Sequence, residues 1–299
     1  MTEMRAEIEG HTLKISNLDK VLYPVTGTTK GEVLNYYVQI ASVLLPHVAD
    51  RAVTRIRWPH GVQGNSFFEK NVPAGAPSWL RTASVPTTGS RGASRNGDEL
   101  VFPVIDGVAS LAYLVNLASL ELHVHQGTVT RAGRPRKPNR LVIDLDPGDP
   151  AGLPECCETA LLVREKLAER GLESSPVTSG SKGLHLYAAL SGDLDSDEVT
   201  ALAKEVAEEL QAESPKLVTA TMTKARRSGK VFLDWSQNAG SKTTVSPYSL
   251  RGREKPWVAT PVTWAEVEEG AGDPLGLEQF RFEEVLERVS ESGDLFDLE

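Results

Sequence analysis

The segment spanning residues 141–146, Leu-Val-Ile-Asp-Leu-Asp, restricts the fold of this chain more than any other part of the sequence. Side chains point alternately to opposite faces along a β-strand. As a strand, this segment places Asp144 and Asp146 on one face and an apolar set on the other, consisting of Leu141, Ile143 and Leu145. Such a strand belongs in a sheet with a packed core on one side and a polar site on the other.

The two aspartates of this strand are candidate metal ligands. Two carboxylates on one face of a strand lie about 7 Å apart, and they repel each other unless a cation lies between them. Divalent ions such as Mg²⁺ or Mn²⁺ prefer oxygen ligands of this kind. The alternative is a pair of solvent-exposed acids at a strand end, and the Asp-x-Asp spacing alone does not decide between the two.

A glycine-rich loop at residues 178–183, Thr-Ser-Gly-Ser-Lys-Gly, is a second candidate site. Gly180 lets backbone N–H groups approach an anion, Ser179 adds a hydroxyl donor and Lys182 adds a positive charge. The loop is not a Walker A motif, because the GxxxxGK[ST] spacing is absent. On its own, it could equally be an ordinary glycine turn.

A third carboxylate, Asp234, lies in the apolar strand expected over residues 231–235. A carboxylate among apolar side chains is costly unless it is paired or bound to a metal, and a salt bridge to an arginine is the alternative. Lys242 and Arg251 follow and can reach phosphate oxygens. Together, these features suit two-metal phosphoryl transfer, in which one metal lowers the pKa of a 3′-hydroxyl and the other stabilises the leaving pyrophosphate.

The rest of the sequence alternates expected strands with expected helices. Apolar spacing predicts a helix that begins at Thr28 or Thr29 as its N-cap, with Glu32 in the first turn. Further helices are expected over 108–120, over 156–170 and from Asp195 or Ser196 to Leu210, and further strands over 11–15, 53–58 and 184–190. Residues 84–98 predict a loop or a loosely held hairpin. This alternation favours an α/β or α+β domain.

Composition and charge narrow the functional classes. The net charge of −9 argues against a simple basic nucleic-acid coat, but basic residues cluster locally at 131–140, 224–230 and 242–255. No apolar run of about 18 residues predicts a membrane span, and the polar N-terminus does not resemble a signal sequence, so we expect a cytoplasmic protein. Cys156 and Cys157 are adjacent, which favours two reduced thiols on a helix.

Several motifs together resemble the polymerase domain of bacterial ligase D, a branch of the archaeo-eukaryotic primase superfamily. The resemblance extends from about residue 13 to residue 295, and the combination of its motifs is highly specific. The matching segments are Asp19-Lys20-Val21-Leu22-Tyr23-Pro24, Thr28-Thr29-Lys30, Arg57-Trp58-Pro59, Phe67-Phe68-Glu69-Lys70, Leu145-Asp146-Pro147-Gly148, residues 179–187, Asp234-Trp235-Ser236-Gln237-Asn238 and Pro247-Tyr248-Ser249-Leu250-Arg251-Gly252-Arg253.

The resemblance implies roles for individual residues. It implies that Asp144, Asp146 and Asp234 are the catalytic metal ligands. The nucleotide contacts that it implies are His123, Ser179, Gly180, Lys182, His185, Lys242 and Arg251. His123 is chosen over His125 by alignment alone. The same resemblance implies a 5′-phosphate pocket formed by Asn17, Lys20 and Lys30, and template contacts from Arg57, Phe67 and Phe68. Without the resemblance, the two lysines would be ordinary surface residues and the two phenylalanines would belong to the core.

The resemblance also implies a fold and a function. The expected fold is α+β and primase-like, with mixed or antiparallel central sheets flanked by helices, in one domain over residues 1–299 with possible loose ends at 1–12 and 291–299. The family fills short gaps during non-homologous end joining, prefers ribonucleotides over deoxyribonucleotides and uses two Mn²⁺ or Mg²⁺ ions. Expected partners are gapped or broken DNA with a 5′-phosphate, Ku and a DNA ligase, for a monomer associated with the nucleoid and not with a membrane.

Two other functions remain open from the residues alone. A glycosyltransferase with an Asp-x-Asp metal site would explain Asp144 and Asp146, but it leaves Asp234 without a role. A module that only bridges DNA ends would explain the basic clusters. It does not explain three aligned carboxylates, which would repel DNA unless metal neutralised them.

Overall fold

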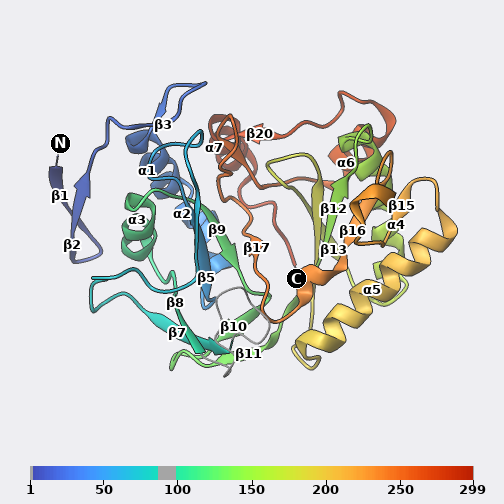
Figure 1. Cartoon of the computed structure of the whole chain (residues 1–299), viewed down its shortest axis with the longest axis horizontal. Helices are drawn as coiled ribbons and strands as arrows, with labels where there is room; N and C mark the ends of the chain where they lie inside the picture. The colour runs from blue at the N-terminus through green and yellow to red at the C-terminus, as the bar shows by residue number, and fades with distance from the viewer. Residues whose placement is uncertain (1–2, 87–98, 299) are drawn as a thin grey trace.

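The computed structural model describes residues 3–86 and 99–298. The polypeptide forms two halves that lie side by side (Figure 1). In the view of Figure 1, the half that contains helices α1, α2 and α3 lies on the left, and the half that contains α4, α5 and α6 lies on the right. Within the described ranges, no helix combines the length and the apolar character needed to cross a membrane.

The N-terminal half combines short antiparallel strands with three helices. In chain order its elements are β1 (Glu3–Ile8), β2 (His11–Ser16), β3 (Val21–Tyr23), β4 (Thr28–Thr29), α1 (Lys30–Gln39), α2 (Ala41–Val48), β5 (Val53–Arg57), β6 (Phe67–Glu69), β7 (Thr82–Pro86), β8 (Glu99–Pro103), α3 (Val108–Asn116), β9 (Ser119–Val124), β10 (Gly127–Val129) and β11 (Pro135–Pro138).

The C-terminal half is built around a larger sheet. Its elements are β12 (Arg140–Pro147), α4 (Leu153–Ala168), β13 (Ser174–Thr178), β14 (Leu184–Ala189), α5 (Ser196–Glu213), β15 (Val218–Thr219), the 3₁₀ helix η1 (Lys224–Arg226), β16 (Val231–Asp234), the 3₁₀ helix η2 (Trp235–Asn238), β17 (Thr244–Val245), β18 (Trp257–Val258), β19 (Thr260–Pro261), α6 (Trp264–Gly272), β20 (Phe280–Arg281) and α7 (Phe282–Ser292).

The larger sheet has six strands in the order β15-β16-β12-β14-β13-β19, and all its pairs are antiparallel except β15 with β16. One face of β12 contributes Leu141, Ile143 and Leu145 to a core that also contains side chains of α4 and α5. Val142 points the other way, into a second core. The predicted strand and its division into two faces are therefore confirmed, and the face that carries Asp144 is turned away from α4 and α5.

The second core joins the two halves of the chain. It contains residues of α1 and α3, residues of the four-stranded sheet ordered β17-β9-β5-β6, and residues of the larger sheet such as Tyr187. β17 comes from the C-terminal part of the chain but pairs with β9 in the N-terminal half. The chain that follows β16 therefore returns to the N-terminal half, so that the segment containing Lys242 runs from the larger sheet to the four-stranded sheet.

The capping predictions for two helices are confirmed. Thr29 is the N-cap of α1 and forms a reciprocal capping box with Glu32. Asp195 is the N-cap of α5 and accepts hydrogen bonds from the amides of Asp197 and Glu198. Polar caps such as these satisfy backbone N–H groups that have no partner inside the helix, so they mark helix starts in the sequence itself.

Two helix boundaries differ from the prediction. The helix expected over 108–120 ends at Asn116, because Ala118 adopts a left-handed backbone with φ of 62° and the chain then enters β9. The helix expected over 156–170 begins earlier, at Leu153, where the Glu155 side chain accepts a hydrogen bond from the Gly152 amide. Cys156 and Cys157 are both buried free thiols in this helix, as predicted.

The expected loop or hairpin over 84–98 is described only at its start. Residues 87–98 lie outside the described residues. The strands on either side, β7 and β8, pair with each other in antiparallel fashion.

Some residues within the expected loose ends, 1–12 and 291–299, contact other parts of the chain. Each residue of β1, from Glu3 to Ile8, pairs with a residue of β2. At the other end, Phe296 is 6% exposed and packs edge-on against His47 and Tyr187.

Candidate active site

Three carboxylates share one face of the six-stranded sheet. Asp144 on β12 lies directly opposite Asp234 on β16, and Asp146 lies opposite Phe232 in the same antiparallel register. The local sequence explains this arrangement, because alternation puts Val231 and Leu233 into the α4/α5 core and leaves Asp234 on the other face. Asp144 and Asp234 are thus neighbours across the two strands, and Asp146 lies two residues further along β12.

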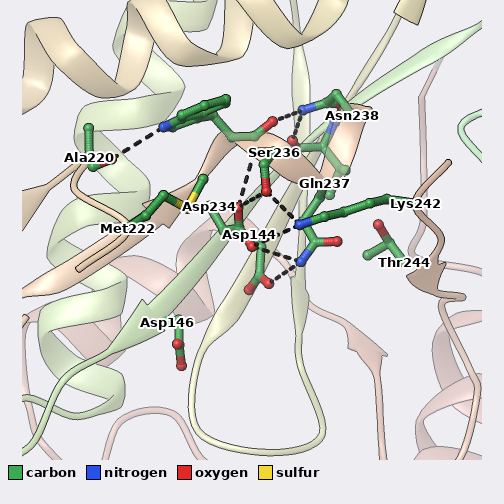
Figure 2. Close-up of polar contacts among 12 residues, drawn as sticks. Asp144, Asp146, Ala220, Met222, Asp234, Ser236, Gln237, Asn238, Lys242 and Thr244 are labelled. Carbon is green, nitrogen blue, oxygen red and sulfur yellow. Dashed lines mark hydrogen bonds and ion pairs between the residues drawn. The ribbon is translucent and has the colours of Figure 1, made fainter. Parts of the chain in front are cut away.

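Polar side chains that follow β16 hold the Asp144–Asp234 pair. Gln237 Nε2 donates to Asp144 Oδ2 at 3.3 Å and to Asp234 Oδ2 at 3.0 Å, so one amide bridges the two carboxylates (Figure 2). The amide and hydroxyl of Ser236 both donate to Asp234 Oδ1. Lys242 Nζ lies 2.6 Å from Ser236 Oγ and 3.9 Å from Asp234 Oδ2. The 3₁₀ turn η2 thus places donors where two negative charges meet.

His185 completes a row across three strands. It is the register partner of Asp144 on β14, and its Nε2 lies 3.4 Å from Asp144 Oδ1. Burial by itself would raise the pKa of Asp144, but His185, Arg251 and Gln237 together hold that pKa below its usual value. Asp144 is therefore an ionised carboxylate with a histidine on one side and a second carboxylate on the other.

Asp146 has the opposite electrostatic character. Burial and the nearby carboxylates of Asp144 and Asp234 raise its pKa, although Arg227 and Lys182 pull the pKa in the other direction. Arg227 Nη1 lies 3.6 Å from Asp146 Oδ2, and its guanidinium lies 3.5 Å from the centre of the Phe232 ring. The negative charge of the three aspartates is therefore only partly balanced by protein side chains.

The three carboxylates have the chemistry of a divalent metal site. Among the described residues, no three histidine, cysteine or acidic side chains already stand in a metal-binding arrangement. Figure 2 shows the reason, because the Asp146 carboxylate lies apart from Asp144 and Asp234. The oxygen-only ligand set, the shared face and the raised pKa of Asp146 all fit a hard cation.

The loop between β13 and β14 is a closed turn. The Gly183 amide donates to Ser179 Oγ at 3.1 Å, and the Ser179 amide donates to the Gly183 carbonyl at 2.9 Å. Gly180 has φ of 62°, and a Cβ there would lie 2.6 Å from Arg251 Cγ and 2.9 Å from the Val258 carbonyl oxygen. Glycine is therefore required at position 180, and the loop leaves Lys182 exposed at its tip.

Arg251 connects this loop to β9. Its Nη1 donates to the Ser179 carbonyl, and its Nε lies 3.3 Å from Glu121 Oε1. His123 Nε2 lies 2.7 Å from the other oxygen of the same carboxylate. The structure therefore brings together His123 and Arg251, and it does so through Glu121. His125 instead packs edge-on against Phe102.

A second group of predicted residues lies in the N-terminal half. Lys20 and Lys30 are joined by a backbone hydrogen bond of 2.7 Å, and the Lys20 amide donates to the Asn17 carbonyl at 3.1 Å. Lys30 Nζ is buried and donates to the Ser16 carbonyl and to Asn116 Oδ1. Burial, followed by the charge of Lys20, lowers the pKa of Lys30 to about 8. Two lysines thus share one small region, in which neutral oxygens of Ser16 and Asn116 accept from the Lys30 ammonium.

A third group lies on the hairpin of β5 and β6. Arg57 pairs with Phe67 in the strand register, and its Nη1 lies 2.6 Å from Glu69 Oε1. Phe67 and Phe68 are 48% and 60% exposed. The alternative that the two phenylalanines belong to the core is therefore wrong. Phe68 and Arg57 also line an open cavity of about 620 Å³ together with Lys70.

Three residues of the site were not predicted as site residues. Arg227 lies in the basic cluster at 224–230 and Gln237 in the segment after Asp234, so both were marked only as parts of longer stretches. Glu121 was not predicted as a site residue because residues 108–120 were expected to form a helix that ends next to it, whereas Glu121 lies in β9. Its signal was the spacing of two between Glu121 and His123, which in a strand puts both side chains on one face.

Residues 29–296 match the sequence profile described as the LigD primase-polymerase domain. This chain belongs to the LigD primase-polymerase family. It is accordingly a nucleotidyltransferase, and the α+β fold expected from the sequence is confirmed. The chain is 49% identical over 283 residues to the multifunctional non-homologous end joining protein LigD of Mycolicibacterium smegmatis, which covers 95% of this chain and 35% of that protein. The bifunctional LigD of Bacillus subtilis is 32% identical, over 94% of this chain and 43% of its own length.

A solved structure extends the comparison from sequence to fold. The polymerase domain from Mycobacterium tuberculosis ligase D, in complex with DNA, superposes with a TM-score of 0.87 at 48% identity. The match covers 95% of this chain and 96% of that one. This LigD chain spans less than half the length of the full-length relatives described above.

Proposed function

We propose that this LigD-family chain is a template-directed polymerase that fills short gaps at broken DNA ends during non-homologous end joining. It prefers ribonucleotides to deoxyribonucleotides. The observation that carries the proposal is the placement of Asp144, Asp146 and Asp234 on one sheet face, beside a glycine loop and an arginine. The relatives that carry this role in their names match nearly all of the chain, which supports the same role here.

The three aspartates would hold two divalent cations, Mn²⁺ or Mg²⁺. In a two-metal site, bound ions activate the attacking oxygen and stabilise the leaving group. The contribution of the protein is the ligand set itself, in which β12 and β16 hold two carboxylates face to face. Gln237 contacts both of these carboxylates and Arg227 lies against Asp146, so these two side chains would have to release carboxylate oxygens to bound ions.

The incoming nucleoside triphosphate would lie between the glycine loop and β9. Ser179, Gly180 and Lys182 offer hydroxyl, amide and ammonium donors on the loop side, and Lys242 and Arg251 add positive charge from the segment that follows β16. His185 and His123 complete the set of nucleotide contacts. An arginine and lysines positioned around glycine-rich backbone are suited to a polyphosphate, because each phosphate oxygen needs a donor.

The DNA would contact the N-terminal half. Lys20, Lys30 and Asn17 would bind the 5′-phosphate of the strand downstream of the gap, because two lysines there lie close together. Phe67 and Phe68 would stack on template bases, and Arg57 would contact the template backbone. Exposed aromatic side chains are effective platforms for unpaired bases, and the solved complex of the Mycobacterium tuberculosis domain with DNA supports DNA binding by this chain.

The remaining expectations concern the setting of the reaction. We infer that the whole chain acts as one monomeric polymerase domain at the nucleoid, together with Ku and a DNA ligase activity. The glycosyltransferase alternative is set aside because the chain belongs to a polymerase family. The bridging alternative has no role for the Asp144–Asp234 pair, whose negative charge would repel DNA.

Extension of a primer across a short gap tests the proposal. We expect the wild type to add the templated nucleotide to a gapped duplex with a 5′-phosphate, faster with a ribonucleotide than with the matching deoxyribonucleotide and faster with Mn²⁺ than with Mg²⁺. Asp144→Ala should abolish addition while DNA binding persists. Addition that ignores the template base, or that persists in Asp144→Ala, would contradict the proposal.

A further inference from the structure

Glu121 is a buried carboxylate whose partners all belong to the proposed nucleotide site. It is 4% exposed, in the middle of β9. One oxygen accepts from the Gly252 amide at 2.9 Å and lies 3.3 Å from Arg251 Nε, and the other contacts His123 Nε2 at 2.7 Å. A buried charge is costly unless it is paired and hydrogen-bonded. The contacts with His123, Arg251 and the Gly252 amide offset this cost for Glu121.

We propose that Glu121 is a positioning residue for nucleotide binding, which fixes the direction of the Arg251 guanidinium and the position of the proton on the His123 ring. Glu121 itself is not placed to bind a phosphate, because it is buried, carries a negative charge and already contacts His123, Arg251 and the Gly252 amide. The inference deepens the proposed function and rests on it for the identity of the ligand.

The contacts of Arg251 explain the first part of the role. Nη1 donates to the Ser179 carbonyl on one side, and Nε faces Glu121 on the other. The backbone of Arg251 is also held, since Tyr23 Oη donates to its carbonyl at 2.8 Å. Within residues 3–86 and 99–298, no protein acceptor takes Nη2 of Arg251. A guanidinium that is hydrogen-bonded through Nη1 and ion-paired through Nε, without a hydrogen bond at Nε, presents its remaining nitrogen in one direction, which is the geometry needed for a phosphate oxygen.

The contact with His123 explains the second part. An ionised carboxylate can only accept hydrogen bonds, so the 2.7 Å contact puts a proton on His123 Nε2. Burial would raise the pKa of Glu121, but His123, Arg251 and the Gly252 amide lower it to about 2. Glu121 therefore stays ionised at neutral pH, and when the His123 ring is neutral, its Nδ1 is the acceptor on the other side.

Glu121→Gln separates positioning from bulk structure. The Gly252 amide and Arg251 Nε are obligate donors, so the single oxygen of the glutamine must face them. The amide NH₂ then points at His123, whose Nε2 has to accept. We expect the neutral ring to change from the Nε2–H tautomer in the wild type to the Nδ1–H tautomer in Glu121→Gln.

Nitrogen-15 spectra of histidine-labelled protein measure this change without any substrate, with the His123 signals assigned by their loss in His123→Asn. An unchanged tautomer in Glu121→Gln would overturn the assignment of the proton to Glu121. Because the measurement uses unliganded protein, it gives an answer even if the proposed polymerase function is wrong.

Nucleotide kinetics test the effect on Arg251. We expect Glu121→Ala to raise the KM for the incoming nucleotide about tenfold, with a smaller change in kcat, and Glu121→Gln to recover most of that loss, since the lost interaction acts through ground-state placement of one charged donor. In an Arg251→Ala background, Glu121→Ala should raise KM clearly less than it does in the wild type, because the part of its effect that acts through Arg251 is already lost and only the part through His123 remains. Additive effects in the double mutant would refute the positioning role.

A matched control is available in the same chain. Glu266 is another partly buried carboxylate, and it binds Arg288 through contacts of 2.6 and 3.0 Å on the α6 side of the fold. Glu266→Ala should reduce stability without changing the KM for the nucleotide. An equal KM increase in Glu266→Ala and Glu121→Ala would show that general destabilisation, and not positioning, causes the effect.

Discussion

Asp144 and Asp234 lie directly opposite each other on two antiparallel strands, and the side-chain amide of Gln237 donates to both carboxylates. The shared amide satisfies one oxygen of each carboxylate but carries no charge. Lys242 and Arg251 supply part of the positive charge that balances the pair, and His185 Nε2 lies 3.4 Å from Asp144. This relationship makes the sheet face between the two halves of the molecule the centre of the proposed chemistry.

Asp234→Asn should abolish nucleotide addition. The substitution keeps the shape of the side chain and its hydrogen bonds to Ser236, but it removes the charge that a divalent cation needs. We expect a loss of about a thousandfold or more in the rate of single-nucleotide gap filling, as for other groups worth several kcal/mol to a transition state. Asp193→Asn, which changes an exposed acid on the loop before α5, is the control and should leave the rate unchanged.

Arg227→Ala should increase the affinity for divalent ions. Arg227 lies 3.6 Å from Asp146 and contributes a positive charge that competes with a bound cation. We expect titration calorimetry with Mn²⁺ to show binding several-fold tighter in the variant. Arg226→Ala removes a neighbouring exposed charge and should have little effect. Weaker or unchanged Mn²⁺ binding in Arg227→Ala would mean that this arginine does not occupy the place of the ion.

The double substitution Lys20→Ala, Lys30→Ala should remove the preference for a 5′-phosphate. For the wild type, we expect gapped DNA with a 5′-phosphate to bind several-fold tighter than the same DNA without it, and the difference should shrink at high salt. The double variant should bind both DNAs alike. Lys14→Ala, in an exposed pair with Glu3, serves as the control. A preserved preference in the double variant would place the phosphate elsewhere.

The effect of the 5′-phosphate should decline as pH rises through about 8. The pKa of Lys30 is lowered to about 8, so the ammonium that attracts phosphate is lost above that pH, and a bound phosphate would move this transition upward. The contribution of Lys30 to the free energy of unfolding changes with pH in the opposite direction. The unfolded chain holds this proton up to the usual lysine pKa, so deprotonation makes folding more favourable as pH rises above about 8. In Lys30→Arg, which stays charged, the phosphate effect should persist across the same pH range.

Phe67→Ala combined with Phe68→Ala should reduce template-dependent addition without unfolding the protein. Both rings are largely exposed, so we expect the free energy of unfolding to change by no more than about 0.5 kcal/mol for each, as for surface sites. Phe102→Ala, at a fully buried position, should instead cost about 3–5 kcal/mol. Urea denaturation and gap filling on the same preparations compare the two variants. A large loss of stability in the Phe67→Ala, Phe68→Ala variant would show that these phenylalanines stabilise the fold instead of binding the template.

Short-range patterns in the sequence determined much of the fold. The alternation over residues 141–146 predicted the strand, the orientation of Asp144 and Asp146 and the core on the opposite face. Polar residues predicted the N-cap of α1 at Thr28 or Thr29 and that of α5 at Asp195 or Ser196, and the caps are Thr29 and Asp195. These signals are visible because periodicity and capping depend on residues within a few positions of each other. The helix expected over 108–120 failed at Ala118, where one left-handed residue leaves no periodic mark.

Only the tertiary structure decided which residues meet. No local signal states that Asp144 pairs with Asp234, because the register between β12 and β16 is set by how the whole sheet packs on α4 and α5. The same holds for Glu121, which joins His123 on its own strand to Arg251 from the loop after β17. The composition and spacing of the sequence thus identified candidate charged residues. Long-range packing brought these residues within contact distance, and contact distance decides their electrostatic interactions, because these act through space and not along the sequence.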